Sequence, residues 1–431
     1  MADAMLMALT LLALCLSVPA LIDTKNILRL DVAGGLLTLA WLLPQAYALR
    51  DDPFSWYFDL SFTYAYIFAC VAFLAIGSFF GRRIGQHRST GEAAASHDAS
   101  STLYDPKKLA DAALVMTAFG SIGFVLMARE SQNFGNSEQW TGVITLYYLM
   151  SQFMVFGGTL GILLFMQYKS KRGLASFLAM IVVATPIFLM FVRRAVLFQI
   201  LAITIGSVVL NKNVRIPRSL MIVGLVISVL ILNGAGAIRQ HVFAGGTIVS
   251  AFSEGVMFQP NPTSDIVAAE LKSAVSDIEM ARSTNHFKPF VMVWNIAVSQ
   301  YVPKFIVGEE FKNSLLIVDN DQSVFESYFA AGATRTGFAE SFTGYWYFGP
   351  LIYLVIGILF GRLWALSNRK DIRSQHVYLV FLLYSLLTIT ESISRIVVTA
   401  PIILTAIWVS FKYAERRSFG DEATGRVQLP R

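Results

Sequence analysis

The stretch Leu174–Leu210, LASFLAMIVVATPIFLMFVRRAVLFQILAITIGSVVL, decides the fold class. Its only charged residues are Arg193 and Arg194, which stand between two apolar runs. A helix that crosses a bilayer needs about 20 predominantly apolar residues, so this stretch can cross twice but leaves no room for a loop. We therefore expect an all-α, polytopic integral membrane protein, with the two arginines at the turn of a tight hairpin.

The composition agrees with a membrane class. The chain is 55% hydrophobic and only 14% charged, with a mean hydropathy of +0.58, which excludes an ordinary soluble domain. The net charge of +6 resides in segments between apolar runs, so it does not indicate a nucleic-acid partner. Cys15 and Cys70 fall inside apolar runs, which excludes a disulfide framework. No His, Cys and carboxylate pattern resembles a zinc site, and we expect neither a metal nor a cofactor.

Extending this pattern along the chain predicts about 11 transmembrane helices. Short segments rich in Lys and Arg separate them, and by the positive-inside rule these segments face the cytoplasm. The N-terminus is then periplasmic, as a retained helix, and the C-terminus cytoplasmic. The expected spans are near 4–22, 32–49, 60–80, 109–127, 142–167, 174–192, 195–210, 219–237, 346–366, 377–393 and 396–411.

The spans define three regions. Residues 1–237 form an N-terminal bundle of eight spans, and residues 346–431 form the last spans and a cytoplasmic tail. Between them, residues 238–345 form one long outward, periplasmic loop lobe, too long for a simple connector. In this lobe we expect a helix capped by Ser264, with Val267, Leu271, Val275 and Ile278 on one face. The short apolar stretch 290–302 is expected to lie at the membrane interface or to re-enter the membrane.

Smaller features follow from the same pattern. Residues 88–108 are expected to form a flexible inner linker, and His376 is expected in an inner loop. Residues 376–411 are expected to cross as two helices, because one helix kinked at Pro401 would move the basic tail to the outer side.

Arginines collect at the expected outer face. An arginine at membrane depth costs roughly 2.5–3.5 kcal/mol on insertion scales and usually marks a function. A set of outward arginines therefore suggests a site for a lipid phosphate, although snorkelling to headgroups would also explain a pair. The residues concerned are Arg193, Arg194, Arg239, Arg335 and Arg395, the last spaced for an ion pair with Glu391.

The most distinctive motif is Gly332–Pro350, GATRTGFAESFTGYWYFGP, which leads into the ninth expected span. Its Gly-x-x-Glu and Tyr-x-Phe-Gly elements resemble the O-antigen polymerases, the Wzy family of oligosaccharide repeat-unit polymerases. The Arg193-Arg194 turn, Ile238-Arg239-Gln240 and Val302-Pro303-Lys304 are similar to features of the same family. The resemblance covers most of the chain by architecture, while its motifs are short.

The resemblance implies a glycosyltransferase at the periplasmic face of the bacterial inner membrane. Such an enzyme joins oligosaccharide repeat units carried on undecaprenyl diphosphate, for O-antigen, capsule or exopolysaccharide. A flippase, a chain-length regulator and membrane lipid are the implied partners. The leaving diphosphate suits Arg193, Arg194, Arg239 and Arg335, because guanidinium groups match phosphate oxygens and stay charged. Glu340 is the first candidate for the general base and His241 the second.

Alternatives remain for these residues and for the function. Glu340 can instead be a helix cap or the partner of Arg335, and His241 a plain loop histidine. Tyr345, Trp346 and Tyr347 can stack on sugars or form an aromatic belt. A ligase would use the same donor, and a lipid-monophosphate glycosyltransferase would use a carboxylate pair such as Asp51-Asp52, which we interpret as an interfacial turn. A flippase or transporter is disfavoured because the spans are mostly uncharged.

Overall fold

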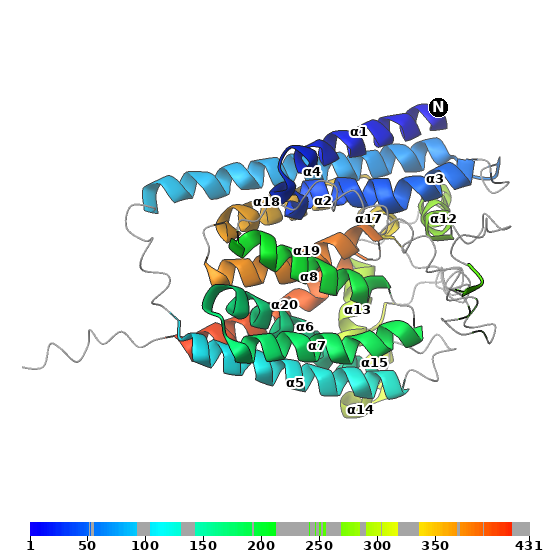
Figure 1. Cartoon of the computed structure of the whole chain (residues 1–431). Coiled ribbons are helices and arrows are strands. Elements are labelled where there is room, and N and C mark those ends of the chain that lie inside the picture. The colour runs from blue at the N-terminus through cyan, green and yellow to red at the C-terminus, as the bar shows by residue number, and fades with distance from the viewer. Residues whose placement is uncertain are drawn as a thin grey trace, which may run out of the picture.

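A computed structural model describes residues 1–50, 52, 56–92, 104–130, 143–191, 194–212, 241, 246, 250, 253–255, 269–284, 290–302, 304–317, 336–368, 371–390 and 392–415. Over these residues the secondary structure is helical, and strands are absent apart from one isolated bridge between Tyr104 and Glu415. The all-α class is confirmed for the part of the chain described (Figure 1).

Seven helical segments within the described residues are long and apolar enough to cross a membrane, so the chain is a multi-pass membrane protein. Two of them are composite, because α2 continues through a π-helical turn into α3, and α17 leads through a 3-10 turn into α18. The segments are α1 (Ala2–Ile22), α2 with α3 (Leu30–Leu37 and Leu43–Arg50), α4 (Leu60–Glu92), α5 (Pro106–Glu130), α6 (Val143–Tyr168), α17 with α18 (Gly337–Tyr345 and Gly349–Ser367) and α19 (Ile372–Thr390).

Three more helices coincide with expected spans. These are α7 (Lys171–Phe191), α8 (Arg194–Lys212) and α20 (Ser394–Ala414). Because α7 ends and α8 begins on either side of residues 192–193, the tight hairpin is confirmed. The separate α19 and α20 confirm the second hairpin, with Pro401 inside α20. The expected span 219–237 lies outside the described residues, so the total of 11 stays a prediction.

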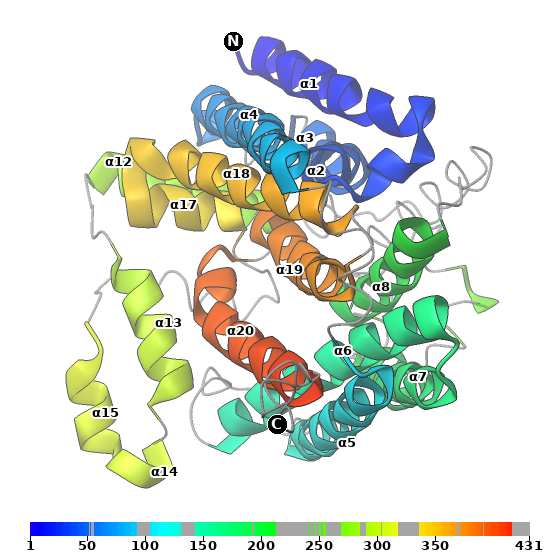
Figure 2. The same ribbon diagram turned by 90° about the vertical axis from the view of Figure 1, so that its left-hand side faces the viewer.

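The long helices lie side by side in a bundle, with α19 inside it (Figures 1 and 2). We call one end of the bundle the lobe end: α1 begins and α3 ends there, and α12 (Ala269–Thr284) and α17 lie beside them. We call the opposite end, where α4 ends and α5 begins, the basic end. One hydrophobic core joins residues from all three expected regions of the chain.

Glycines bring α4 and α18 into backbone contact. Gly77 and Gly81 of α4 face Gly357 and Gly361 of α18, and each pair has the spacing of four that lines small residues along one helix face. A Cβ atom at Gly81 would lie 2.1 Å from the carbonyl oxygen of Ile358. In membranes such small-residue stripes let helices approach closely and gain packing and hydrogen-bonding energy. The contact thus joins the N-terminal and C-terminal parts of the chain.

Glycines also bring α5 and α6 into backbone contact. A Cβ atom at Gly120 would lie 2.0 Å from the backbone nitrogen of Met154, and one at Gly157 would lie 2.5 Å from the carbonyl oxygen of Ala113. Glycines therefore permit close helix contacts in both halves of the bundle.

A buried ion cluster lies towards the basic end. Arg82 donates from Nη1 to both carboxylate oxygens of Asp31 at 2.9 Å, and Arg29 donates from Nη2 to Oδ2 at 2.6 Å. The hydroxyl of Ser78 donates to Oδ1 at 3.1 Å. Asp31 directly precedes the expected span 32–49 and lies in the apolar helical segment Leu30–Arg50. The cluster holds α2 against α4.

The buried helix α19 carries polar side chains that bond to its neighbours. A ring nitrogen of His376 lies 3.0 Å from the carbonyl oxygen of Phe156, and His376 is fully buried. Gln167 donates to Gln375 at 2.9 Å, and the Tyr384 hydroxyl bonds to Gln152. The expectation of an inner loop at His376 is therefore wrong. Hydrogen bonds across the core offset the cost of burying these groups.

The structure describes parts of two segments expected between the spans, the linker 88–108 and the stretch 290–302. Helix α4 continues to Glu92, so the expected linker does not begin at Arg88, and residues 93–103 lie outside the described part. The expected interfacial stretch forms α13 (Val291–Tyr301), followed by α14 (Lys304–Val307) and α15 (Glu309–Leu315). The indole nitrogen of Trp294 donates to the carbonyl oxygen of Leu315 at 2.7 Å, which ties α13 to α15.

Candidate functional site

Helix α12 of the lobe begins against α3. The backbone nitrogen of Leu271 donates to Oε1 of Gln45 at 3.1 Å, and the Gln45 amide donates to Glu270 at 3.1 Å. One side chain of α3 thereby satisfies a free N–H of the first turn of α12 and holds a first-turn carboxylate. The expected helix is confirmed at Leu271, Val275 and Ile278, which are all buried. Ser264 and Val267 lie outside the described residues.

A buried ion pair continues this contact. Nζ of Lys272 lies 2.7 Å from Oδ2 of Asp52, and the two side chains are 11% and 5% exposed. Asp52 lies in the bend that follows α3, and its ion pair makes it a docking partner for α12. Asp51 lies outside the described part of the chain. Removing one partner of such a pair would leave an uncompensated buried charge.

The other end of α12 is held by Arg282. Its Nη1 lies 3.3 Å from a carboxylate oxygen of Asp59 and 3.3 Å from one of Glu279, and its guanidinium lies 4.6 Å from the centre of the Phe62 ring. Burial raises the pKa of Glu279. Burial also acts to raise the pKa of Asp59, but hydrogen bonds from Ser61 and Arg282 outweigh it and lower that pKa. Asp59 therefore stays ionised at neutral pH.

The distinctive motif folds as α17. Thr336 caps this helix, because its hydroxyl accepts from the backbone nitrogen of Ala339 at 3.3 Å. Glu340, one turn later, is 2% exposed. Its Oε2 accepts from the backbone nitrogen of Ile393 at 2.7 Å, and Ile393 precedes the first residue of α20. The Glu340 carboxylate is thus a cap for α20, supplied from another helix, at the positive end of its dipole.

Aromatic rings surround α17. Phe342 stacks on Trp346 with ring centres 5.0 Å apart and meets Tyr66 of α4 edge-on at 5.1 Å. The Tyr66 hydroxyl bonds to Oγ of Ser341 at 2.7 Å. Tyr347 packs on Phe342 and remains exposed. The cluster anchors α17 to α4, and Tyr347 is more exposed than Tyr345 and Trp346.

His241 forms a local contact in the glycine-rich segment. Its Nε2 lies 2.7 Å from Oγ of Ser250, and the backbone nitrogen of Gly246 donates to its carbonyl oxygen at 3.0 Å. A Cβ atom at Gly246 would lie 2.2 Å from Nε2, so the ring requires glycine there. The ring is partly exposed.

The arginines are only partly described. Arg194 is the first residue of α8, and Arg395 is the second residue of α20. Both helices start towards the lobe end, but the structure does not describe these two side chains. Arg193, Arg239, Arg335 and Glu391 lie outside the described residues. Arg335 directly precedes the capping residue Thr336 in the sequence.

The described residues contain no cluster of three or more His, Cys, Asp or Glu side chains that could hold a metal ion. The chain matches no protein-family model, no curated protein and no solved structure. The lobe end is therefore interpreted from its own geometry. The sequence analysis did not identify three residues of this region, because their partners are distant in the chain and no local pattern marks them. These residues are Gln45, Lys272 and Asp59.

Proposed function

We propose that the chain is a polysaccharide polymerase of the bacterial inner membrane, with its lobe end facing the periplasm. It joins oligosaccharide repeat units linked to undecaprenyl diphosphate, and arginines at the lobe end stabilise the leaving diphosphate. Support comes from the multi-pass bundle, from the motif 332–350 that enters α18, and from the basic segments at the opposite end of the bundle.

One observation carries the proposal: the hydrogen bond from the Ile393 backbone nitrogen to Glu340. It joins α17, whose cap follows Arg335, to the start of α20, whose second residue is Arg395. The bond thereby ties the helix that follows Arg335 to the start of α20 at the lobe end. It supports the proposal that this end of the bundle holds the diphosphate.

The proposed reaction makes specific demands on these residues. A hydroxyl of the acceptor sugar attacks the anomeric carbon of the donor, and the bond to the diphosphate oxygen breaks. Negative charge builds on the leaving diphosphate, where guanidinium groups bind two oxygens in a fork. Placing fixed positive charge where negative charge develops commonly supplies a large part of catalysis. A base accepts the proton of the attacking hydroxyl.

Replacing Arg193, Arg194, Arg239 or Arg335 by lysine is expected to shorten the polymer. Lysine keeps the charge and reaches headgroups, but it lacks the planar fork. Charge-assisted contacts are worth about 1.5–3 kcal/mol each, which corresponds to roughly 10- to 100-fold in rate when expressed in the transition state. The measurement is glycan chain length in cells at matched protein level.

Arg172→Lys is the matched control, since Arg172 pairs with Asp111 on an exposed surface at the basic end. Normal long polymer from all four lobe-end variants would overturn the arginine clamp. A reconstituted assay that supplies only the lipid-diphosphate oligosaccharide then separates a polymerase from a ligase, because a ligase needs a different acceptor.

Glu340 is a candidate for two roles, the general base and the cap of α20. Its burial favours the second, a positioning role. Glu340→Gln is expected to keep polymer formation within about threefold, because the glutamine carbonyl can still accept from Ile393 while its amide is not basic. Glu340→Ala is expected to lower both protein level and polymer, because the N–H loses its partner. Loss of polymer in Glu340→Gln at normal protein level would instead make Glu340 the base. His241 is retained as the candidate base under the first outcome.

A further inference from the structure

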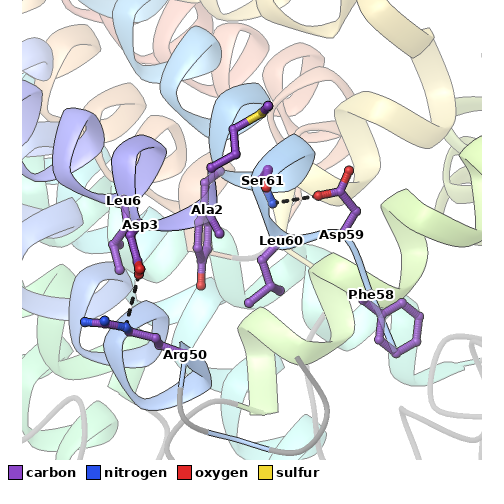
Figure 3. Close-up of a pocket in the computed structure, with 10 residues that line it drawn as sticks. Ala2, Asp3, Leu6, Arg50, Phe58, Asp59, Leu60 and Ser61 are labelled. Atoms are coloured by element: carbon purple, nitrogen blue, oxygen red, sulfur yellow. Dashed lines mark hydrogen bonds and ion pairs between the residues drawn. The ribbon is translucent and has the colours of Figure 1, made fainter. Parts of the chain in front are cut away.

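An open, polar surface pocket, here called the cavity, lies at the lobe end of α1, α3 and α4. Its volume is about 370 Å³, within the range of small-molecule sites. Figure 3 shows its lining side chains, which come from the start of α1, the end of α3 and the residues at the start of α4, with Asp3 facing Arg50 and Asp59 facing Ser61. The lining residues that carry polar groups are Asp3, Arg50, Asp59, Ser61 and Tyr64.

An ion pair and hydrogen bonds within the protein fix the orientation of the polar groups that line the cavity. Nε of Arg50 lies 3.0 Å from Oδ1 of Asp3, and the carboxylate of Asp59 accepts from the backbone nitrogen of Ser61 at 3.1 Å (Figure 3). The hydroxyl of Tyr64 donates to the carbonyl oxygen of Ala46 at 3.1 Å. Carboxylates have several lone-pair sites each, and a guanidinium has five N–H donors, so ion-paired groups can also bind ligand hydroxyls.

Three aromatic residues directly precede Asp59 in the sequence. Trp56 and Tyr57 are 80% and 81% exposed, and Phe58, the next residue, lines the cavity. Exposed rings next to carboxylates suit a ligand that has both apolar C–H faces and hydroxyl groups. A membrane-interface belt is the other use of exposed Trp and Tyr, and it would require no cavity and no carboxylates.

The charges select the class of ligand. The lining carries two carboxylates, those of Asp3 and Asp59, and two positive groups, the guanidinium of Arg50 and the α-amino group of Met1. These charges balance, so the lining has no positive excess to hold a diphosphate. We propose that this cavity binds a neutral saccharide unit. Its role as the acceptor subsite rests on the proposed function, whereas the binding itself does not.

The test is direct binding by the full-length protein in detergent. An array of free neutral oligosaccharides is the probe, followed by titration of those that bind, with inorganic pyrophosphate as the counter-probe. Phe58→Ala and Asp59→Asn are each expected to weaken binding at least tenfold, because both residues line the cavity. The matched control is Trp294→Ala, which removes an exposed tryptophan of α13 outside the cavity. Binding of pyrophosphate but of no saccharide, or saccharide binding unchanged in both cavity variants, would overturn the proposal.

Arg282→Gln separates binding from the docking of α12, because it removes the partner of Asp59 without changing the lining. Saccharide binding is expected to persist within about threefold in this variant, and a tenfold loss would show that Asp59 acts only through α12. The assay contains no lipid diphosphate. The four arginine-to-lysine variants should therefore bind saccharide normally, so failure of the polymerase and failure of the cavity give different results.

Discussion

Gly81→Ala is expected to destabilise the protein by more than about 3 kcal/mol, and Gly344→Ala is expected to leave it equally or more stable. Alanine normally stabilises a helix relative to glycine by about 0.5–1 kcal/mol. At Gly81, however, the new Cβ would lie 2.1 Å from a backbone carbonyl oxygen of α18, whereas at Gly344 it would meet no atom within 4 Å. Overpacking usually costs about 1–3 kcal/mol, and a backbone cannot move aside as a side chain can.

The measurement is unfolding of the detergent-solubilised protein, together with its yield in membranes. Gly361→Ala should behave like Gly81→Ala, since its Cβ would lie 2.2 Å from the carbonyl oxygen of Ser78. Equal stability of the Gly81 and Gly344 variants would show that α4 and α18 are not in backbone contact.

Asp31→Ala is expected to cost about 3–5 kcal/mol, the typical loss when one partner of a buried charge cluster is removed. The substitution would leave the guanidinium groups of Arg29 and Arg82 inside the bundle without the carboxylate that binds both. Because this cluster lies away from the lobe end, the loss should appear in unfolding and in membrane yield. Polymer formed per folded molecule should not change.

The control for this prediction is Asp111→Ala. Asp111 pairs with Arg172 at 2.5 Å, but the two side chains are 42% and 63% exposed, so the expected loss is below about 1 kcal/mol. Combining Asp31→Asn with Arg82→Gln should cost less than the sum of the two single changes, because the double variant removes both charges of a coupled pair. Additive costs would contradict a coupled cluster.

The sequence alone determined the features that depend only on residues close to one another along the chain. The apolar run 174–210 with its two arginines predicted the α7–α8 hairpin, since span length and charge position are local properties. The spacing of Leu271, Val275 and Ile278 predicted the buried face of α12 for the same reason.

Only the tertiary structure decided the contacts between groups far apart in the chain. Glu340 was recognisable as a special residue, but its bond to Ile393 depends on how α17 meets α20. Lys272 reaches Asp52 across more than 200 residues, and His376 is buried because its helix lies inside the bundle. Periodicity records which face of a helix is apolar. It does not record the partner of a polar group, because a buried charge is stabilised by whatever the packing of other helices brings within a few ångströms.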